Sequence, residues 1–491
     1  MEEQRNLTHV AVPTIRDNSL EGEEKMVEEV EMLREGAGRA RVTYRPNMKD
    51  LEKLGKSLQF LLEYDVERVD GEVLLMDGHF VHFLAPDLLP VLKQHVVFVI
   101  DSSGSMSGRK MEQTKNAMAA ILGQIGPTDF FSIVDFDSEA KDVLIAMKGT
   151  QKNIADAVEA VASLDAGGGT NIHDALLRAL EIVDQAEMKE LQPLIVFLTD
   201  GQADGPAAKI QADVAARNRR GLAIFSLAFG TGADFEMLQK LSLQNHGFAR
   251  KIYEGGDAAI QLQGFYKEVA SPLLSGVNFT YVGDAVEETS LTETTFHTFF
   301  KGSEMVVAGK LTGSEGTRFE YSVEGSGREA YVCSYSQNGH EVKSVPLLTS
   351  RPMDTFLEVA RQRKSQGFLE RLWAFLRVSE LLKKMEATED EAAKEKALEL
   401  ALKYGFVTRL TSLVVVRKDK GQEVGQDQKE TMDYEYDSGS GLNFASNMGP
   451  PSKSNSFNRK VSHMSFSGVQ HLDSTWSIFV PFLYCLKFKW F

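Results

Sequence analysis

The chain has 491 residues, of which 43% are hydrophobic, so it is long enough for two to four domains with substantial cores. Its formal net charge of −16 argues against a nucleic-acid-binding protein, which would need a basic face. The two cysteines, Cys333 and Cys485, lie in different regions and provide neither a disulfide framework nor a zinc-binding spacing.

The first 93 residues divide into a polar segment and a β-type region. Residues 1–40 are rich in glutamate, and we expect a mobile segment there, although Glu21–Arg34 also has the composition of a charged helix. The first ten residues contain no apolar signal segment. Over 41–93 we expect a partial β-rich domain that ends in a proline-marked linker. Its candidate strands are Leu58–Tyr64, Glu72–Met76 and Phe80–Leu84, with an Asp77-Gly78 turn between the last two.

Continuous apolar runs alternate with amphipathic helical patterns over residues 94–271. Met111, Met118 and Ile121 share one helical face, for example. Apolar strands separated by such helices indicate a parallel sheet covered on both faces. We therefore predict an α/β domain with a doubly wound, Rossmann-like parallel sheet. Its apolar runs are Val96–Ile100, Phe130–Phe136, Leu194–Thr199 and Leu222–Phe229.

Polar residues cluster where these predicted strands end. The run Asp101–Ser105 has the pattern D-x-S-x-S and follows a strand directly, and Asp200 follows another strand. Ligands collect at the carboxyl ends of the strands in such a sheet. The Asp101 carboxylate and the Ser103 and Ser105 hydroxyls are hard oxygen donors, which suit Mg²⁺, Mn²⁺ or Ca²⁺ rather than zinc or copper. A glycine-rich segment that ends in Thr170 and Asn171 is flexible enough to approach the same place.

Other interpretations of the D-x-S-x-S loop explain less. An EF-hand would need glycine where Met106 stands, and it would need a helix before the loop. The glycine–lysine spacing does not match a P-loop, and no G-x-S-x-G nucleophile elbow is present. A serine-rich turn that only caps the next helix through Ser105 or Ser107 leaves Thr170 and Asp200 unexplained.

Several titratable residues near these strand ends are given structural roles. Asp135 and Asp137 are expected to be solvated turn residues, of which Asp137 could add charge near the site. Asp204 is expected to cap a helix that begins near Pro206. His173 is expected to be a packed or solvated helix residue, because a site built from oxygen donors does not need imidazole.

The remaining chain predicts a β-rich and then helical region over 272–417, followed by a disordered tail over 418–491. The tail is dominated by Gly, Ser, Asn and Asp, which cannot bury enough apolar surface to order it. Its apolar stretch Trp476–Leu486 is too short to span a membrane. The expected elements are strands at Phe279–Val282, Met305–Ala308 and Tyr331–Cys333, helices over Phe356–Lys384 and Ala392–Tyr404, and a strand at Leu413–Val416.

The strand-end segments together resemble the metal-ion-dependent adhesion site of a von Willebrand factor type A domain. The resemblance implies that Ser103, Ser105 and Thr170 offer hydroxyl ligands. It also implies that Asp101 and Asp200 hold the ion directly or through water, with an open coordination position for a partner's carboxylate. Mg²⁺ is the ion expected first, with Mn²⁺ or Ca²⁺ as alternatives.

A wider resemblance runs from about Val42 to Arg417. Gly78–Pro86, Leu372–Leu376 and Ala401–Thr408 are similar to segments of the inter-alpha-trypsin inhibitor heavy chain family. Members have a β-rich VIT domain before the A domain and are secreted, so the resemblance implies a truncated extracellular member. The missing leader leaves a cytoplasmic location as the alternative. Some heavy chains are joined to hyaluronan through the aspartate of an Asp-Pro pair, and this chain has no such pair, so covalent transfer is not expected.

These features predict a non-enzymatic, metal-dependent binding protein. Its partner would be a protein or matrix component that presents a carboxylate, in hyaluronan-associated matrix, and neither nucleic acid nor a membrane span is involved. The alternatives are an intracellular A-domain scaffold and a subunit of a protease-inhibitor complex. A metal-dependent hydrolase is disfavoured, because no general base accompanies the site. Two sequons, at Asn278 and Asn6, are candidate glycosylation sites.

Overall fold

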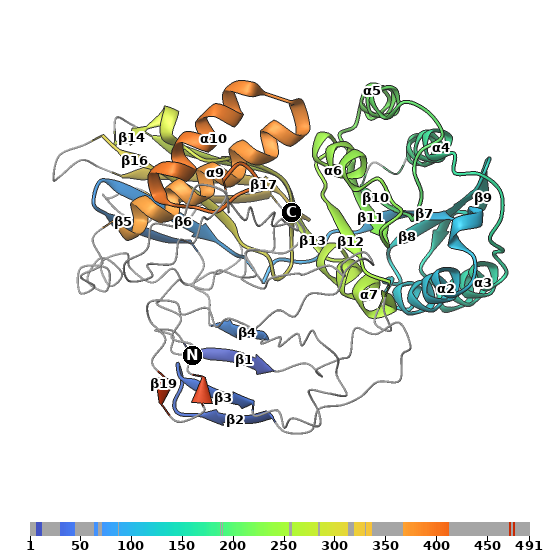
Figure 1. Cartoon of the computed structure of the whole chain (residues 1–491), viewed down its shortest axis with the longest axis horizontal. Helices are drawn as coiled ribbons and strands as arrows, with labels where there is room; N and C mark the ends of the chain where they lie inside the picture. Colours follow the sequence, from blue (N-terminus) through green and yellow to red (C-terminus); the bar gives the residue numbers. More distant parts are fainter. Residues whose placement is uncertain are drawn as a thin grey trace, which may run out of the picture. The chain divides into compact units, whose positions relative to one another are not determined.

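A computed structural model describes residues 6–11, 30–44, 63–66, 71–86, 88–186, 188, 190–254, 258–282, 285–312, 319–328, 330–335, 367–411, 471–472 and 475–476 (Figure 1). They fall into two compact units, one with the described residues of 6–66 and 471–476, the other with those of 71–411. The expected strand Leu413–Val416 lies outside the described residues. So do residues 58–62 and 356–366 of two other expected elements, nearly all of Trp476–Leu486, and most of the expected tail.

The first unit consists of short antiparallel pairs. Strand β1 (Leu7–Ala11) pairs with β4 (Glu63–Val66), β2 (Val30–Arg34) with β3 (Ala40–Tyr44), and β19 (His471–Leu472) with β20 (Thr475–Trp476). Its small core contains Leu7, Val10 and Ala40. The expectation of a helix over Glu21–Arg34 is wrong for its described part, because Val30–Arg34 is strand β2.

The second unit contains a six-stranded sheet in the order β12-β11-β10-β7-β8-β9. The prediction of a doubly wound, largely parallel sheet is confirmed. Antiparallel edge strand β9 was not predicted, although its sequence contains the apolar run Val143–Met147; its residues are half-buried or exposed. The strands are β7 (Gln94–Asp101), β8 (Phe130–Phe136), β9 (Ala140–Lys148), β10 (Gln192–Thr199), β11 (Ala223–Phe229) and β12 (Ala249–Ile252).

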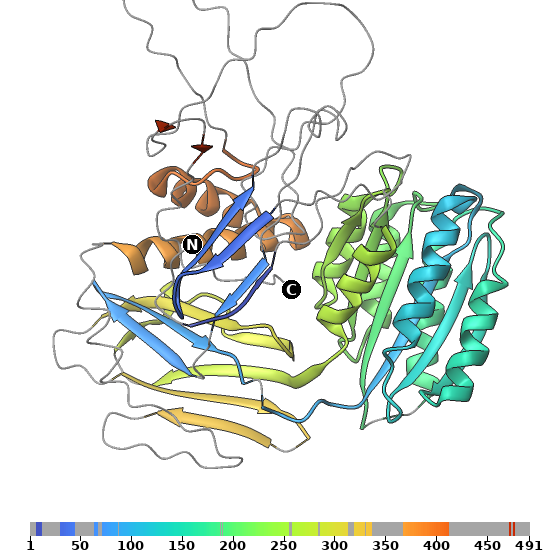
Figure 2. The same cartoon turned by 90° about the horizontal axis from the view of Figure 1, so that it is seen from below.

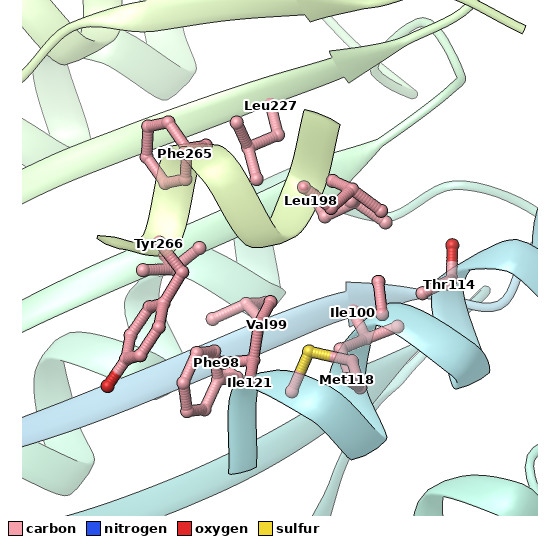
Figure 3. Close-up of a pocket in the computed structure, with 13 residues that line it drawn as sticks. Phe98, Val99, Ile100, Thr114, Met118, Ile121, Leu198, Leu227, Phe265 and Tyr266 are labelled. Carbon is pink, nitrogen blue, oxygen red and sulfur yellow. The ribbon is translucent and has the colours of Figure 1, made fainter. Parts of the chain in front are cut away.

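Helices cover both faces of this sheet (Figure 1). One face carries α2 (Arg109–Leu122), α3 (Gln151–Ala162) and α7 (Ala258–Val269). The other carries α4 (Ile172–Gln185), α5 (Ala207–Arg217) and α6 (Phe235–Gln244). Figure 3 shows how Met118 and Ile121 of α2 and Phe265 of α7 close over a small apolar cavity above β7. The predicted helical faces are therefore the ones that build the core.

The strand order reverses beside β7. The chain leaves β7 to form β8 on one side, and it returns to form β10 on the other. Loops that leave in opposite directions open a crevice at the carboxyl ends of these strands, where α/β proteins bind ligands. Asp101 ends β7 and Asp200 directly follows β10, so both carboxylates lie at this point.

A β-sandwich is built from residues on both sides of the α/β domain. Strand β6, which precedes that domain, pairs antiparallel with β16, which follows it (Figure 2). Residues of the expected regions 41–93 and 272–417 thus share one sheet and one core, in which Phe80, Val277 and Val307 are buried. One sheet contains β14 (Val286–Glu287), β16 (Met305–Leu311), β6 (His79–Leu84) and β5 (Glu72–Met76), and the other β15 (Thr295–Phe300), β13 (Pro272–Val282), β17 (Glu320–Ser326) and β18 (Ala330–Tyr335).

Two helices complete the second unit, α9 (Phe368–Thr388) and α10 (Glu391–Tyr404). Their mutual core contains Val378, Leu381 and Ala397. The α9 side chain Trp373 donates an indole hydrogen bond to the Ser290 carbonyl of the sandwich, at 2.7 Å. This bond satisfies the polar atom of a buried aromatic side chain, as a stable interface requires.

Acid is expected to destabilise the second unit through two buried histidines. Burial lowers the pKa of His82 in β6 to about 3 and that of His95 in β7 to about 4, from an ordinary value of 6.5. Between pH 6.5 and about 4 the unfolded chain takes up these protons and the folded chain does not. As the pH is lowered through this range, the free energy of unfolding should therefore decrease by about 1.4 kcal/mol per pH unit for each histidine.

Urea unfolding at pH 7 and pH 5 measures this dependence. A His82→Gln/His95→Gln variant removes both titrating groups and should lose that part of the pH dependence. An unchanged difference between pH 7 and pH 5 in the double variant would contradict the assignment.

Candidate metal centre

The Asp101 carboxylate is held at the end of β7 by groups from two neighbouring segments. Its Oδ1 atom accepts a hydrogen bond from the Ser103 backbone N–H at 2.8 Å, and Oδ2 accepts one from the Thr199 hydroxyl of β10. The side chain is fully buried, and this burial raises its pKa, with the nearby Asp200 charge acting in the same direction. A buried carboxylate that accepts few hydrogen bonds is stabilised by a nearby positive charge, so it is a potential ligand for a cation.

Serine hydroxyls connect Asp101's loop to Asp200. Ser103 Oγ lies 3.0 Å from Ser105 Oγ, and Ser105 Oγ donates to Asp200 Oδ1 at 2.7 Å. The chain therefore brings four of the five predicted side chains into one hydrogen-bonded cluster. We call Asp101, Ser103, Ser105 and Asp200 the strand-end cluster.

The interpretation of these serines as helix caps is wrong. Helix α2 is preceded by Gly108, and none of the side chains that the structure describes caps its N-terminus. Ser107 Oγ instead donates to the Gly104 carbonyl at 2.8 Å, which closes the short 3₁₀ turn Gly104–Met106. Ser105 is thus free of a capping role and is directed at Asp200.

The glycine-rich loop places Thr170 beside the strand-end cluster. Gly167 N–H donates to the Ser102 carbonyl at 2.7 Å, and Gly104 N–H donates to the Gly168 carbonyl at 3.2 Å. Thr170 Oγ1 lies 3.1 Å from where a Cβ atom on Gly201 would stand, so the hydroxyl is adjacent to the residue that follows Asp200. Among the hydrogen bonds of the described residues, none joins this hydroxyl to the strand-end cluster.

Asp204 has a different role from the one expected. Its Oδ2 atom accepts a hydrogen bond from the Thr170 backbone N–H at 3.1 Å. Pro206 is the N-cap residue that precedes α5, and within the described part of the chain no side chain caps that helix. Asp204 therefore anchors the Thr170 loop, and its expected helix-capping role is wrong.

The two aspartates near the end of β8 differ from each other. Asp135 is only 8% exposed, and burial raises its pKa, so the expectation of a solvated turn residue is wrong for it. One of its carboxylate oxygens is buried without a hydrogen-bond partner among the described residues. Asp137 is more accessible and accepts from Lys141 Nζ at 2.7 Å, which lowers its pKa.

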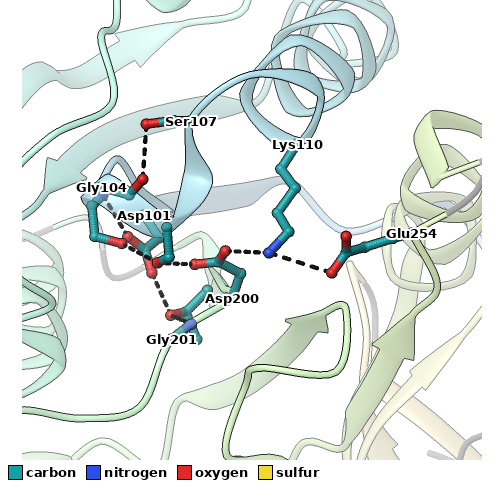
Figure 4. Close-up of polar contacts among 10 residues, drawn as sticks. Asp101, Gly104, Ser107, Lys110, Asp200, Gly201 and Glu254 are labelled. Atoms are coloured by element: carbon teal, nitrogen blue, oxygen red, sulfur yellow. Dashed lines mark hydrogen bonds and ion pairs between the residues drawn. The ribbon is translucent and has the colours of Figure 1, made fainter. Parts of the chain in front are cut away.

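Two charged residues beside the strand-end cluster, Lys110 and Glu254, were not predicted from the sequence. Lys110 Nζ donates to Asp200 Oδ2 at 2.7 Å and lies 3.3 Å from Glu254 Oε1 (Figure 4). Partial burial opposes ionisation of Lys110, but the hydrogen bond to Asp200 prevails and raises its pKa. The sequence signal that could have identified Lys110 was its place in the first turn of a predicted helix, where the helix dipole disfavours positive charge.

The chemistry of the donors fits a hard divalent cation. Asp101 and Asp200 supply carboxylates, and Ser103, Ser105 and Thr170 supply hydroxyls, so every candidate ligand is an oxygen. Within the described ranges no cluster of three or more His, Cys, Asp or Glu side chains is suited to a metal ion. Hydroxyl groups, backbone carbonyls or water would therefore complete the coordination of an ion bound by the two aspartates.

Comparisons with known proteins agree with this architecture. Residues 95–268 match the von Willebrand factor type A domain family. Inter-alpha-trypsin inhibitor heavy chain H4 of Bos taurus is 37% identical over 410 residues, which cover 79% of this chain and 43% of that protein. Heavy chain H3 of Homo sapiens is 38% identical over 381 residues, covering 74% and 41%.

The chain belongs to the inter-alpha-trypsin inhibitor heavy chain family. It spans about two-fifths of the length of the curated relatives it matches. Among solved structures, a von Willebrand factor type A protein from Catenulispora acidiphila aligns with 69% of this chain and 84% of its own, with 17% identity and a TM-score of 0.47.

Two further sequence features of this heavy-chain family member can be located. Asn278 is exposed in β13, where its side-chain oxygen accepts a hydrogen bond from Thr295 at 3.0 Å, and Asn6 is exposed just before β1. No helix in the described part of the chain combines the length and the apolar character needed to cross a membrane.

Proposed function

We propose that the α/β domain binds a divalent cation through Asp101, Ser103, Ser105, Thr170 and Asp200. The observation that carries this proposal is the 2.7 Å hydrogen bond between Ser105 Oγ and Asp200 Oδ1. This bond joins an oxygen atom of the loop that follows β7 to an oxygen atom of the loop that follows β10. Two loops that leave a sheet in opposite directions thereby offer converging oxygen atoms, as a hard cation requires.

The proposed ion is Mg²⁺, with Mn²⁺ or Ca²⁺ as alternatives, and its proposed use is adhesion. A bound divalent ion supplies a local positive charge and a coordination position for an external carboxylate. This local charge matters for a chain with a formal net charge of −16, which would otherwise repel an acidic partner. We propose a binding function rather than a catalytic one.

The proposed partner is a protein or matrix component that presents a carboxylate outside the cell. Family membership supports this setting, as does the exposed sequon asparagine Asn278, which would be accessible to glycosylation in the secretory pathway. Association with hyaluronan-containing matrix is part of the same proposal. Covalent transfer to hyaluronan is not, because the sequence has no Asp-Pro pair.

Calorimetric titration of Mg²⁺ and Mn²⁺ into the purified chain, with acetate as a carboxylate mimic, tests the proposal. We expect binding heat for the wild type and none for Asp101→Ala/Asp200→Ala. A matched control, Asp156→Ala/Glu159→Ala, removes two exposed carboxylates from α3 and should bind as the wild type does. Absence of heat in the wild type, or equal heat in the folded site variant, would refute the metal centre.

A further inference from the structure

Lys110 occupies a position that is unfavourable for a lysine unless its charge is neutralised by the strand-end cluster. It lies in the first turn of α2, where the partial positive charge of the helix N-terminus repels a cation. The cost is offset by Asp200, whose carboxylate is fully buried and accepts from Lys110 Nζ at 2.7 Å. The ammonium thus neutralises one of the two carboxylates proposed to hold the divalent ion.

A second acceptor for Lys110 lies on the far side of its ammonium group. Glu254 Oε1, just beyond the end of β12, is 3.3 Å from Lys110 Nζ, and the Glu254 side chain is 40% exposed. Its carboxylate packs across Gly230, where an added Cβ atom would stand only 1.9 Å from Oε1. The absence of a side chain at Gly230, which has a φ of +75°, therefore leaves the space that Glu254 occupies.

We propose that the Lys110 ammonium competes with the divalent cation for the Asp200 carboxylate. When the cation binds, Lys110 leaves Asp200 and pairs with Glu254 instead. This inference rests on the proposed function. A divalent ion at the strand-end cluster repels the ammonium, and Glu254 allows Lys110 to leave Asp200 without losing its ion pair. The lysine holds the buried Asp200 carboxylate in place when divalent ions are scarce, and it lowers the affinity of the site for them.

Mn²⁺ titration by calorimetry into the purified full chain tests this role. Lys110→Met should tighten the Mn²⁺ dissociation constant by about tenfold or more, because the ion no longer competes with a cation for Asp200. Glu254→Gln should weaken it by about threefold, since Lys110 then has no second carboxylate. The double variant should bind like Lys110→Met alone, because Glu254 acts only through the lysine.

Lys115→Met is the matched control. It removes one lysine charge from the same helix, where Lys115 contacts only the Ala162 carbonyl among its described hydrogen bonds, and it should leave the dissociation constant within about twofold of wild type. Thermal melts give an independent readout. Lys110→Met leaves Asp200 buried without its counter-ion, so it should melt below the wild type in EDTA and gain more from Mn²⁺ than the wild type does.

The outcomes separate the two proposals. Mn²⁺ binding by the wild type, with unchanged or weaker binding by a folded Lys110→Met, would overturn the role of Lys110 and leave the metal centre standing. No binding by any variant would overturn both. Tightening in Lys115→Met equal to that in Lys110→Met would also overturn the inference, because general charge would then explain the effect.

Discussion

Replacing Gly247 by alanine will destabilise the second unit by more than about 4 kcal/mol, a loss at the extreme of single substitutions. Gly247 lies between α6 and β12, and a Cβ atom there would stand 2.0 Å from the carbonyl oxygen of Ile224 and 2.6 Å from its carbon. Ile224 is fully buried in β11, and its own N–H donates to the Asn245 carbonyl at 3.0 Å. The contact is with backbone on both sides, so no side-chain rotation can relieve it.

Urea unfolding followed by circular dichroism measures the effect. Gly264→Ala is the control, because Gly264 lies within α7 and an added Cβ atom there would have no neighbour within 4 Å among the described residues outside the backbone of that helix. That change should stabilise the protein by about 1 kcal/mol, since alanine is the better helix former. A loss below about 1 kcal/mol for Gly247→Ala would show that β11 and the α6–β12 connection separate more easily than the backbone contacts imply.

Replacing Asp101 by asparagine will abolish stabilisation by Mg²⁺ without destabilising the protein in EDTA. At a free Mg²⁺ concentration 100 times the dissociation constant, the wild type should gain about 2.7 kcal/mol. The variant should gain nothing measurable, because it lacks one of the two carboxylates. Its amide oxygen can still accept from the Ser103 N–H, so the local turn is retained.

The behaviour in EDTA follows from the burial of Asp101. A pKa raised by burial means that the ionised carboxylate destabilises the folded state at pH values above the pKa of the unfolded chain. An uncharged asparagine does not carry this penalty at pH 7. Differential scanning calorimetry in EDTA and in Mg²⁺ measures both effects. An equal Mg²⁺-induced shift in the two proteins would mean that the ion is held without Asp101.

Much of the α/β domain could be predicted from local patterns. Strand β8 has the predicted bounds Phe130–Phe136, and β7 and β10 extend the predicted runs by at most a few residues. These strands are buried on both faces, so their sequences are mostly apolar and easily recognised. Strand β9 was not predicted, although Val143–Met147 is an apolar run; it lies at the sheet edge, and its residues are half-buried or exposed.

Contacts between distant segments could not be predicted in this way. The pairing of β6 with β16 crosses the whole α/β domain, and the Lys110–Glu254 contact joins the start of α2 to the end of β12. Asp135 was misjudged for the same reason. Its burial depends on packing around the strand end rather than on its sequence neighbours.

The sequence by itself determined the chemical type of the candidate site. Two aspartates and three hydroxyl residues at predicted strand ends indicate oxygen donors for a hard cation, because strand polarity places those ends at one edge of a parallel sheet. Only the tertiary structure decided which charges face these donors. It directs Lys110 to Asp200, and Asp204 to the Thr170 backbone, because side-chain direction across a crevice depends on how several loops pack together.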